Sequence, residues 1–186
     1  MHSVFQSSLP ARPYCADDFT HGIFREARDK AAERAFVQFN ASALWRWMIF
    51  DIDRDGAFFA PEDRGCPVPT FTAINRANGH AHLGYMLEVP VSRSPKTSAS
   101  AVRFFEDVER GMTHRLGSDA GYSGFLCKNP LNPRWETAWQ ACEPYSLHRL
   151  HDCLNKSDKK RRPRQEIRTG VGRNVALFDA VRLQAY

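Results

Sequence analysis

Residues 47–53 read Trp-Met-Ile-Phe-Asp-Ile-Asp, a run of apolar side chains that ends in two carboxylates. Apolar and aromatic residues in a short block are typical of a buried strand. Because successive side chains of a strand point to opposite faces, Asp51 and Asp53 are expected on one face and Ile52 on the other. Neighbouring carboxylates repel each other unless a cation lies between them, and their oxygens suit Mg²⁺ or Mn²⁺. The stretch therefore predicts a metal site at the end of a strand.

The same acids also begin a calcium-loop pattern. The EF-hand loop is matched position by position at Asp51, Asp53, Asp55, Gly56 and Glu62. An EF-hand needs an amphipathic helix before its loop, whereas residues 44–50 form a short block with three aromatics. Pro61 also falls inside the loop, and the chain has no second copy of the pattern. A magnesium or manganese site is favoured, and a purely structural acidic turn is the other alternative.

Composition bounds the class of protein. The 186 residues are 42% hydrophobic and 12% aromatic, enough for one well-packed domain with a short extension. There is no basic-then-apolar leader and no apolar run of about 18 residues, so we expect a cytoplasmic protein without membrane contact. We also expect a monomer. The five cysteines form no Cys-x-x-Cys pair and are expected to be reduced. No standard zinc spacing is matched by Cys142, His148, His151 and Cys153.

Hydrophobic periodicity and turn residues indicate the elements. Strands are expected at residues 36–39, 47–53, 70–74, 80–87 and 121–127. Helices are expected at residues 22–35, 98–116, 144–154 and 174–186. Residues 1–13 lack periodicity and are expected to be extended or to cover the domain, and residues 54–69 form a loop. This order predicts an α+β fold with an RRM-like mixed or antiparallel sheet of four to six strands and helices on one face.

A second chemical motif is the pair His80-Ala-His82. On a strand both imidazoles face the same side. This strand follows the acidic strand and the hairpin turn, where neighbouring strands of the sheet could bring the histidines beside Asp51 and Asp53. Further along the chain, Asp119 could complete a metal shell and Lys128 could neutralise a phosphate.

The basic charge is concentrated in one segment. Residues 155–174 carry eight Lys or Arg against Asp158 and Glu166, a local +6 that exceeds the +5 of the whole chain. Within it, residues 159–164 read Lys-Lys-Arg-Arg-Pro-Arg, which is typical of a solvated linker or of an arm attracted to phosphates.

Four motifs together resemble a known family. They are Phe-Asp-Ile-Asp at 50–53, Asn-Gly-His-Ala-His-Leu-Gly-Tyr at 78–85, Gly-Tyr-Ser-Gly at 121–124 and Lys-Asn-Pro-Leu at 128–131. They resemble plasmid replicases of the RepA type, replication initiators with an archaeo-eukaryotic primase (primase-polymerase) core. Residues 170–186 are similar to the beginning of the helical PriCT module that follows such cores. The resemblance implies a primase-like catalytic domain at residues 1–154, a basic linker at 155–170 and the start of a truncated PriCT-like module at 171–186.

The resemblance also implies an activity, namely synthesis of a short primer on a DNA template at a plasmid origin by a metal-dependent nucleotidyltransferase. Its partners would be DNA and nucleoside triphosphates, and its cofactor Mg²⁺ or Mn²⁺. The catalytic, metal-binding acids would be Asp51, Asp53 and Asp119. The nucleotide-binding residues would be His82, His80, Lys128 and Ser123. DNA phosphates would be contacted by Lys159, Lys160, Arg161 and Arg162.

Two other classes of function stay open. A His-x-His pair is also similar to the metal-binding pair of rolling-circle (HUH) nickases, for which Tyr122 or Tyr145 would have to be the nucleophile. A non-catalytic origin-binding module is consistent with the basic segment and with Trp135 and Trp139.

Overall fold

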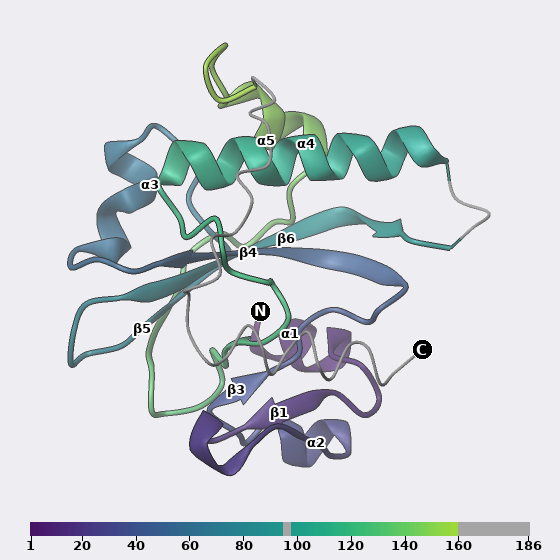
Figure 1. The fold of residues 1–186 in the computed structure, drawn as a ribbon, viewed down its shortest axis with the longest axis vertical. Helices are drawn as coiled ribbons and strands as arrows, with labels where there is room; N and C mark the ends of the chain where they lie inside the picture. Colours follow the sequence, from purple (N-terminus) through teal and green to yellow (C-terminus); the bar gives the residue numbers. More distant parts are fainter. Residues whose placement is uncertain (95–97, 160–186) are drawn as a thin grey trace.

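Two four-stranded antiparallel sheets lie one above the other in the computed structural model, which describes residues 1–94 and 98–159 (Figure 1). The larger sheet has the order β4 (Leu44–Ile52), β6 (Ala81–Ser92), β5 (Phe71–Ile74) and β8 (Glu136–Trp139). The smaller sheet has the order β2 (Phe24–Arg25), β1 (Tyr14–Ala16), β3 (Phe36–Val37) and β7 (Cys127–Lys128). The α+β class with antiparallel pairing is confirmed, although a single sheet had been expected.

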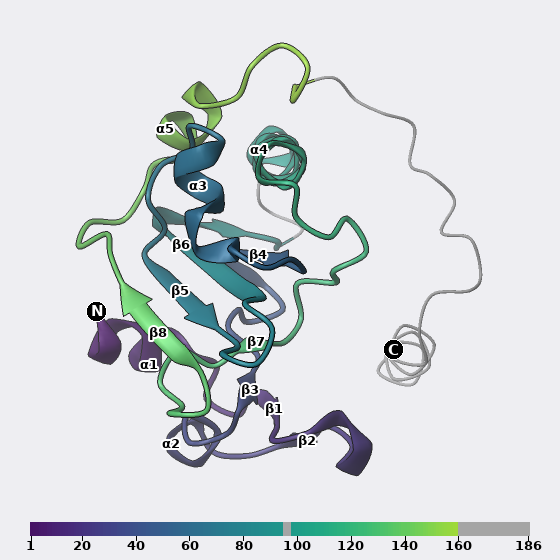
Figure 2. The same ribbon diagram turned by 90° about the vertical axis from the view of Figure 1, so that its left-hand side faces the viewer.

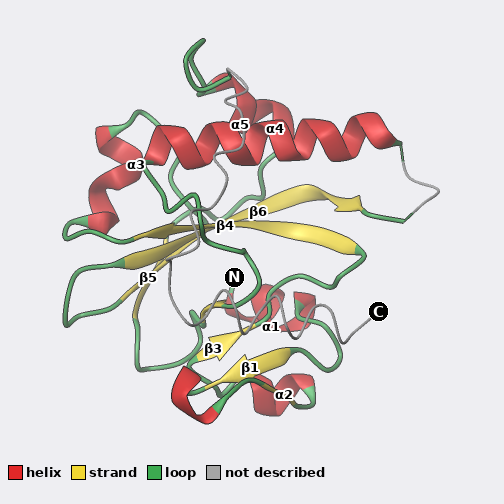
Figure 3. Ribbon diagram, viewed as in Figure 1, coloured by secondary structure: helices red, strands yellow, loops and turns green. Residues whose placement is uncertain are grey.

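The helices fall into two groups, as Figures 2 and 3 show. One face of the larger sheet is covered by α3 (Ala60–Asp63), α4 (Ala99–Leu116) and α5 (Leu147–Asp152). On the side of the smaller sheet lie α1 (His2–Ser8) and α2 (Arg28–Ala31). Short 3-10 turns occupy Phe19–His21 and Ala57–Phe59. The larger sheet is therefore the middle layer of three.

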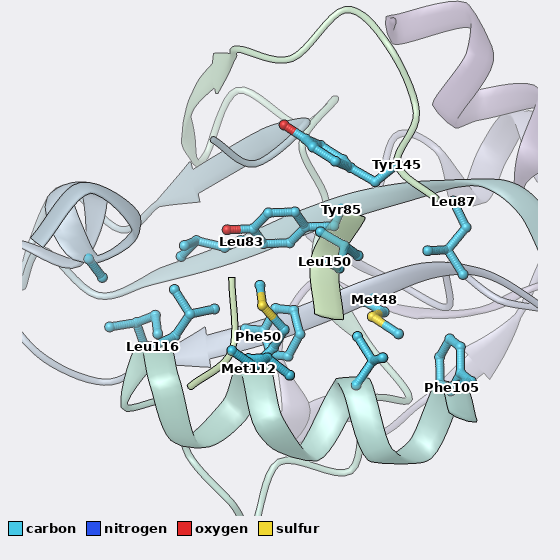
Figure 4. Close-up of a cluster of buried hydrophobic side chains, with 14 of the residues drawn as sticks. Met48, Phe50, Leu83, Tyr85, Leu87, Phe105, Met112, Leu116, Tyr145 and Leu150 are labelled. Carbon is cyan, nitrogen blue, oxygen red and sulfur yellow. The ribbon is translucent and has the colours of Figure 1, made fainter. Parts of the chain in front are cut away.

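The alternating side chains of the larger sheet build two separate cores. Toward α4, the strands β4 and β6 present Met48, Phe50, Ile52, Leu83, Tyr85 and Leu87. They pack against the apolar stripe of α4, which contains Phe105, Val108, Met112 and Leu116 (Figure 4). Burial of such side chains contributes about 1.5–3 kcal/mol each before the entropy cost is subtracted. This stripe holds α4 on the sheet.

The opposite face of the same strands packs on the smaller sheet. Trp47 and Ile49 of β4, with Phe71 of β5, join Phe5 of α1 and Val37 of β3 in the second core. Asp51 continues the series of Trp47 and Ile49, so its side chain leaves the sheet on this side, at the end of the apolar series. The second core ends where the acidic residues begin.

Several local predictions are confirmed. The helix expected at 98–116 is α4, and Gly117 ends it with φ +65°. The hairpin expected around Asn78-Gly79 joins β5 and β6, and Gly79 has φ +69°. The helix expected at 144–154 is α5, which begins after Ser146, whose side chain accepts a hydrogen bond from the Arg149 N–H at 3.2 Å.

Other elements differ from the prediction because partners distant in the sequence decide them. Residues 22–35 are not one helix: Gly22 has φ +85°, and β2 pairs with β1, which leaves only the four residues of α2 helical. Residues 121–126 are a loop, with only the next two residues in β7. Residues 1–13 contain α1, residues 54–69 contain α3, and β8 was not predicted. The helix expected at 174–186 lies outside the described residues.

Among the residues that the structure describes, no helix is both long enough and apolar enough to cross a bilayer.

The close packing of Phe71 on β6 gives a stability test. A Cβ added at Gly84 would overlap the Phe71 ring, whereas one added at Gly111 of α4 would meet only the end of the flexible Leu154 side chain. We expect Gly84→Ala to lower the free energy of unfolding by about 1–3 kcal/mol. In Gly111→Ala the contact is offset by a gain in helix propensity of about 1 kcal/mol. Equal losses in the two variants, measured by urea unfolding, would contradict this packing.

Candidate functional site

Asp51, near the end of β4, is the centre of a group of charged side chains. The β4–β6 register places it opposite His82, and its Oδ1 lies 3.1 Å from His82 Nε2. The same oxygen lies 3.4 Å from Lys128 Nζ, which comes from β7 of the smaller sheet. The three side chains are largely buried, with exposed fractions of 16% for Asp51, 5% for His82 and 10% for Lys128. The site therefore joins the two sheets.

The hydrogen bonds of His82 fix its tautomer. The backbone N–H of Lys128 donates to His82 Nδ1 at 3.1 Å. Nδ1 therefore carries no proton, and the proton on Nε2 is donated to Asp51. Burial lowers the pKa of His82, and the nearby Lys128 charge lowers it further, so the ring is neutral at physiological pH.

Asp51 is held in its ionised form. Burial alone raises the pKa of this carboxyl, but the hydrogen bond from His82 and the positive charge of Lys128 outweigh burial and leave the pKa below its ordinary value. An ionised carboxylate accepts hydrogen bonds or binds a cation, and it cannot donate a proton.

Asp53 and His80 form a second acid–histidine pair beside the first. Asp53 follows the last residue of β4, and its Oδ1 lies 3.1 Å from His80 Nδ1. This pair is more accessible, with 55% of the Asp53 side chain and 32% of the His80 side chain exposed. The two motifs predicted to meet, the acidic pair and the histidine pair, are brought together residue by residue.

The acids fit a hard divalent cation. Mg²⁺ usually keeps several waters and is bound by one or two carboxylates together with substrate phosphates. Asp51 and Asp53 supply two such carboxylates from one end of β4, and the two contacts of Asp51 go to Oδ1. Within residues 1–94 and 98–159, no group of three His, Cys, Asp or Glu is placed to hold a metal ion.

Asp119 reaches this site through its backbone. Its N–H donates to the Asp51 carbonyl at 2.8 Å, which ties the loop after α4 to the edge of β4. Its exposed carboxylate accepts the Gly121 N–H at 2.8 Å. Asp119 thus lies next to Asp51 along the strand, while its carboxylate caps a turn in its own loop. Ser123 is exposed in the same loop.

A cleft of about 360 Å³ opens beside the acids, between α4 and residues 118–124. Asp119, Tyr122 and Ser123 line it from the loop, and Glu109 lines it from α4. The Tyr122 ring also meets the His82 ring edge-on, with 5.0 Å between ring centroids. Tyr122 therefore contacts both the cleft and the acid–histidine pairs.

The aromatic residues considered for DNA nicking or for DNA binding make contacts within the domain. The hydroxyls of Tyr122 and Tyr145 donate to the Leu126 and Val68 carbonyls, both at 2.6 Å. Trp135 is buried in the second core, and its Nε1–H donates to the Ala35 carbonyl at 2.6 Å. Trp139 packs against the same core. These aromatics hold the domain together.

Neither of the other metal patterns is formed. The segment before the acidic loop is the strand β4, where an EF-hand requires a helix, and Asp55 Oδ1 accepts the Gly56 N–H at 2.8 Å. The cysteines and histidines considered for zinc belong to no cluster of three metal ligands in the described part of the chain.

Lys159 is exposed at the end of the second described range, and Lys160, Arg161 and Arg162 lie outside it, as do residues 171–186.

Sequence reasoning assigned no role to two residues near the site, Asn129 and Glu109. Asn129 is fully buried, and its Nδ2 donates to the Ala32 and Arg34 carbonyls at 2.8 and 2.7 Å, which fixes the end of β7 beside Lys128. Its position directly after Lys128 was the available signal. Glu109 of α4 gave none, because an acid on a long helix is usually a solvated surface residue.

The structure of this chain was compared with solved structures. It is similar to the AEP domain of the primase-polymerase (PrimPol) of cyanophage S-2L, with a TM-score of 0.53 at 10% sequence identity, and the match covers 77% of this chain and 88% of that one. The fold is thus that of an archaeo-eukaryotic primase domain. The family profile described as Replicase family matches residues 8–154, so the chain belongs to the Replicase family and acts in replication. A search of curated proteins found no match.

The Lys128 contact gives a titration test. Lys128→Met removes the positive charge 3.4 Å from Asp51, so the pKa of the Asp51 carboxyl should rise, as followed by carboxyl-carbon NMR. In the wild type this pKa is depressed, so its contribution to stability is present above about pH 4 and is lost as the pH falls through the folded-state pKa. The stability difference between variant and wild type should therefore shrink on acidification. Lys30→Met, an exposed site on α2, is the control and should leave Asp51 unchanged.

Proposed function

We propose that this protein is a plasmid replication initiator whose described domain synthesises a short primer on a DNA template by metal-dependent nucleotidyl transfer. The observation that carries the proposal is the face on which Asp51 and Asp53 each meet a histidine, with Lys128 beside them. Membership of the Replicase family and the primase fold support it. The basic run that begins at Lys159 would contact DNA phosphates.

The acids place the metal and move no proton. Asp51 and Asp53 would hold Mg²⁺ or Mn²⁺, and Asp119 is the nearest further acid along the edge of β4. The bound ion would supply Lewis-acid stabilisation of charge on the transferred phosphoryl group. The depressed pKa of Asp51 keeps this carboxyl ionised, as a metal ligand must be.

The basic groups bind the triphosphate. Lys128 provides a positive charge at the inner end of the site, and His80 provides a ring at its outer, accessible end. His82 holds Asp51 in place through Nε2 and would contact the nucleotide from β6, two residues after His80. Ser123 offers a hydroxyl from the loop. Because Lys128 and His82 are buried, their geometry is set before substrate binds.

Replacing both acids tests the proposal at its centre. Asp51→Asn combined with Asp53→Asn should lower Mn²⁺-dependent nucleotide incorporation by at least about 100-fold. Asparagine at 51 still accepts the His82 hydrogen bond but no longer neutralises Lys128, so the free energy of unfolding should fall by no more than about 3 kcal/mol. Incorporation is measured on a primed single-stranded template, and folding by thermal melting.

The matched control is Asp55→Asn, two residues further along the same acidic run. Asp55 bonds to the Gly56 N–H and contacts neither histidine in the described structure, so activity should stay near the wild-type value. Undiminished incorporation in the double variant would remove the polymerase function.

The two histidines separate primer synthesis from DNA nicking. In a primase, His82→Ala and the better-packed His82→Gln should raise the nucleotide KM or lower kcat, while His80→Ala should do much less, because His80 is at the exposed end of the site. In a nickase both histidines would bind metal, so their variants would lose metal affinity equally. A nicked-plasmid assay completes the test: cleavage that disappears in Tyr122→Phe or Tyr145→Phe would establish the nickase instead.

A further inference from the structure

The cleft beside the acids has a chemical character opposite to that of a phosphate site. Its lining contains three acids, Glu106, Glu109 and Asp119, and three aliphatic hydroxyls, from Thr113, Ser118 and Ser123. Its cation, Arg110, already donates from Nη2 to Asp107 Oδ1 at 2.8 Å. Carboxylates repel phosphates and accept hydrogen bonds from hydroxyl and amino groups. The cleft therefore suits an uncharged ligand that is rich in hydrogen-bond donors.

Glu109 lines this cleft from α4. It lies partly buried on α4, and within the described ranges its carboxyl has no hydrogen-bond or ion-pair partner. Burial, together with the negative charge of Glu106, raises the pKa of Glu109 to about 7. Because this carboxyl lines an open cleft, it can accept a hydrogen bond from a ligand bound there.

The cleft and the acid–histidine face share two structural elements. The Tyr122 ring lines the cleft on one side and contacts His82 on the other. The Asp119 N–H bonds to the Asp51 carbonyl, so the loop that lines the cleft is attached to β4 at the catalytic acid. The cleft and the acid–histidine pairs are therefore neighbours in the fold.

We propose that the cleft binds the nucleoside part of the incoming nucleotide, with the Glu109 carboxyl hydrogen-bonded to a sugar hydroxyl. The proposal rests on the proposed function, because that function places the triphosphate beside Lys128, His80 and His82. The volume of about 360 Å³ lies at the lower end of the range of about 300–1,000 Å³ for small-molecule sites, which suits a nucleoside. The negative triphosphate would lie beside Lys128 and the uncharged nucleoside would lie in the cleft, which would set the orientation of the nucleotide.

The test measures the binding of the two halves of the nucleotide separately, on the full 186-residue chain without metal. Adenosine probes the cleft and inorganic tripolyphosphate probes the Lys128 end, each by ligand-observed NMR. Ala120→Phe places a ring in the cleft from an exposed loop position, so adenosine binding should weaken at least about 10-fold while tripolyphosphate binding is kept. Glu109→Gln changes shape little and should weaken adenosine binding about 3- to 10-fold.

The control is Ala27→Phe, at an exposed position before α2, and it should bind both probes as the wild type does. Adenosine that binds Ala120→Phe and Glu109→Gln as tightly as the wild type would overturn the assignment, as would unchanged nucleotide KM in both variants. The proposed function fails by a different result: a chain that binds adenosine in the cleft but incorporates no nucleotide with Mn²⁺ would refute primer synthesis and leave the cleft assignment standing.

Discussion

The antiparallel register between β4 and β6 is the constraint on which the rest of the structure depends. It places Asp51 opposite His82 on one face of the larger sheet and Phe50 opposite Leu83 on the other. Side chains alternate with a period of two, so a shift of one residue would turn the acids toward α4 and the core residues toward the smaller sheet. The hydrophobic core and the charged site are therefore specified together, and neither could move without the other.

The smaller sheet completes the site electrostatically. A buried carboxylate is costly unless it is paired and hydrogen-bonded, and β7 brings the Lys128 ammonium to Asp51 and the Lys128 N–H to His82. Asn129 fixes the end of that strand by bonding to carbonyls of the α2–β3 connection. The second layer thus stabilises an ionised Asp51 in a largely buried position.

The charges around the site are divided between two neighbouring spaces. Positive and neutral bases, Lys128, His80 and His82, surround the acids at the end of β4, whereas carboxyls and hydroxyls line the cleft behind Tyr122. A nucleotide has the same division, with a negative triphosphate and an uncharged nucleoside. The fold of a primase domain is retained here at 10% identity to the cyanophage domain, which indicates that the arrangement of layers tolerates extensive sequence change.

The sequence by itself determined the elements whose signals are local: the strand that carries the acids, the β5–β6 hairpin and α4 follow from periodicity and turn residues. It also predicted that the acidic and histidine motifs would meet, and they do so on β4 and β6, which pair although β5 lies between them in the sequence. Only the tertiary structure decided that residues 22–35 would form a hairpin strand and one helical turn, that Lys128 would reach Asp51, and that Glu109 would face a cleft. Those outcomes depend on contacts between segments far apart in the chain, whose packing energy exceeds the small differences in local propensity.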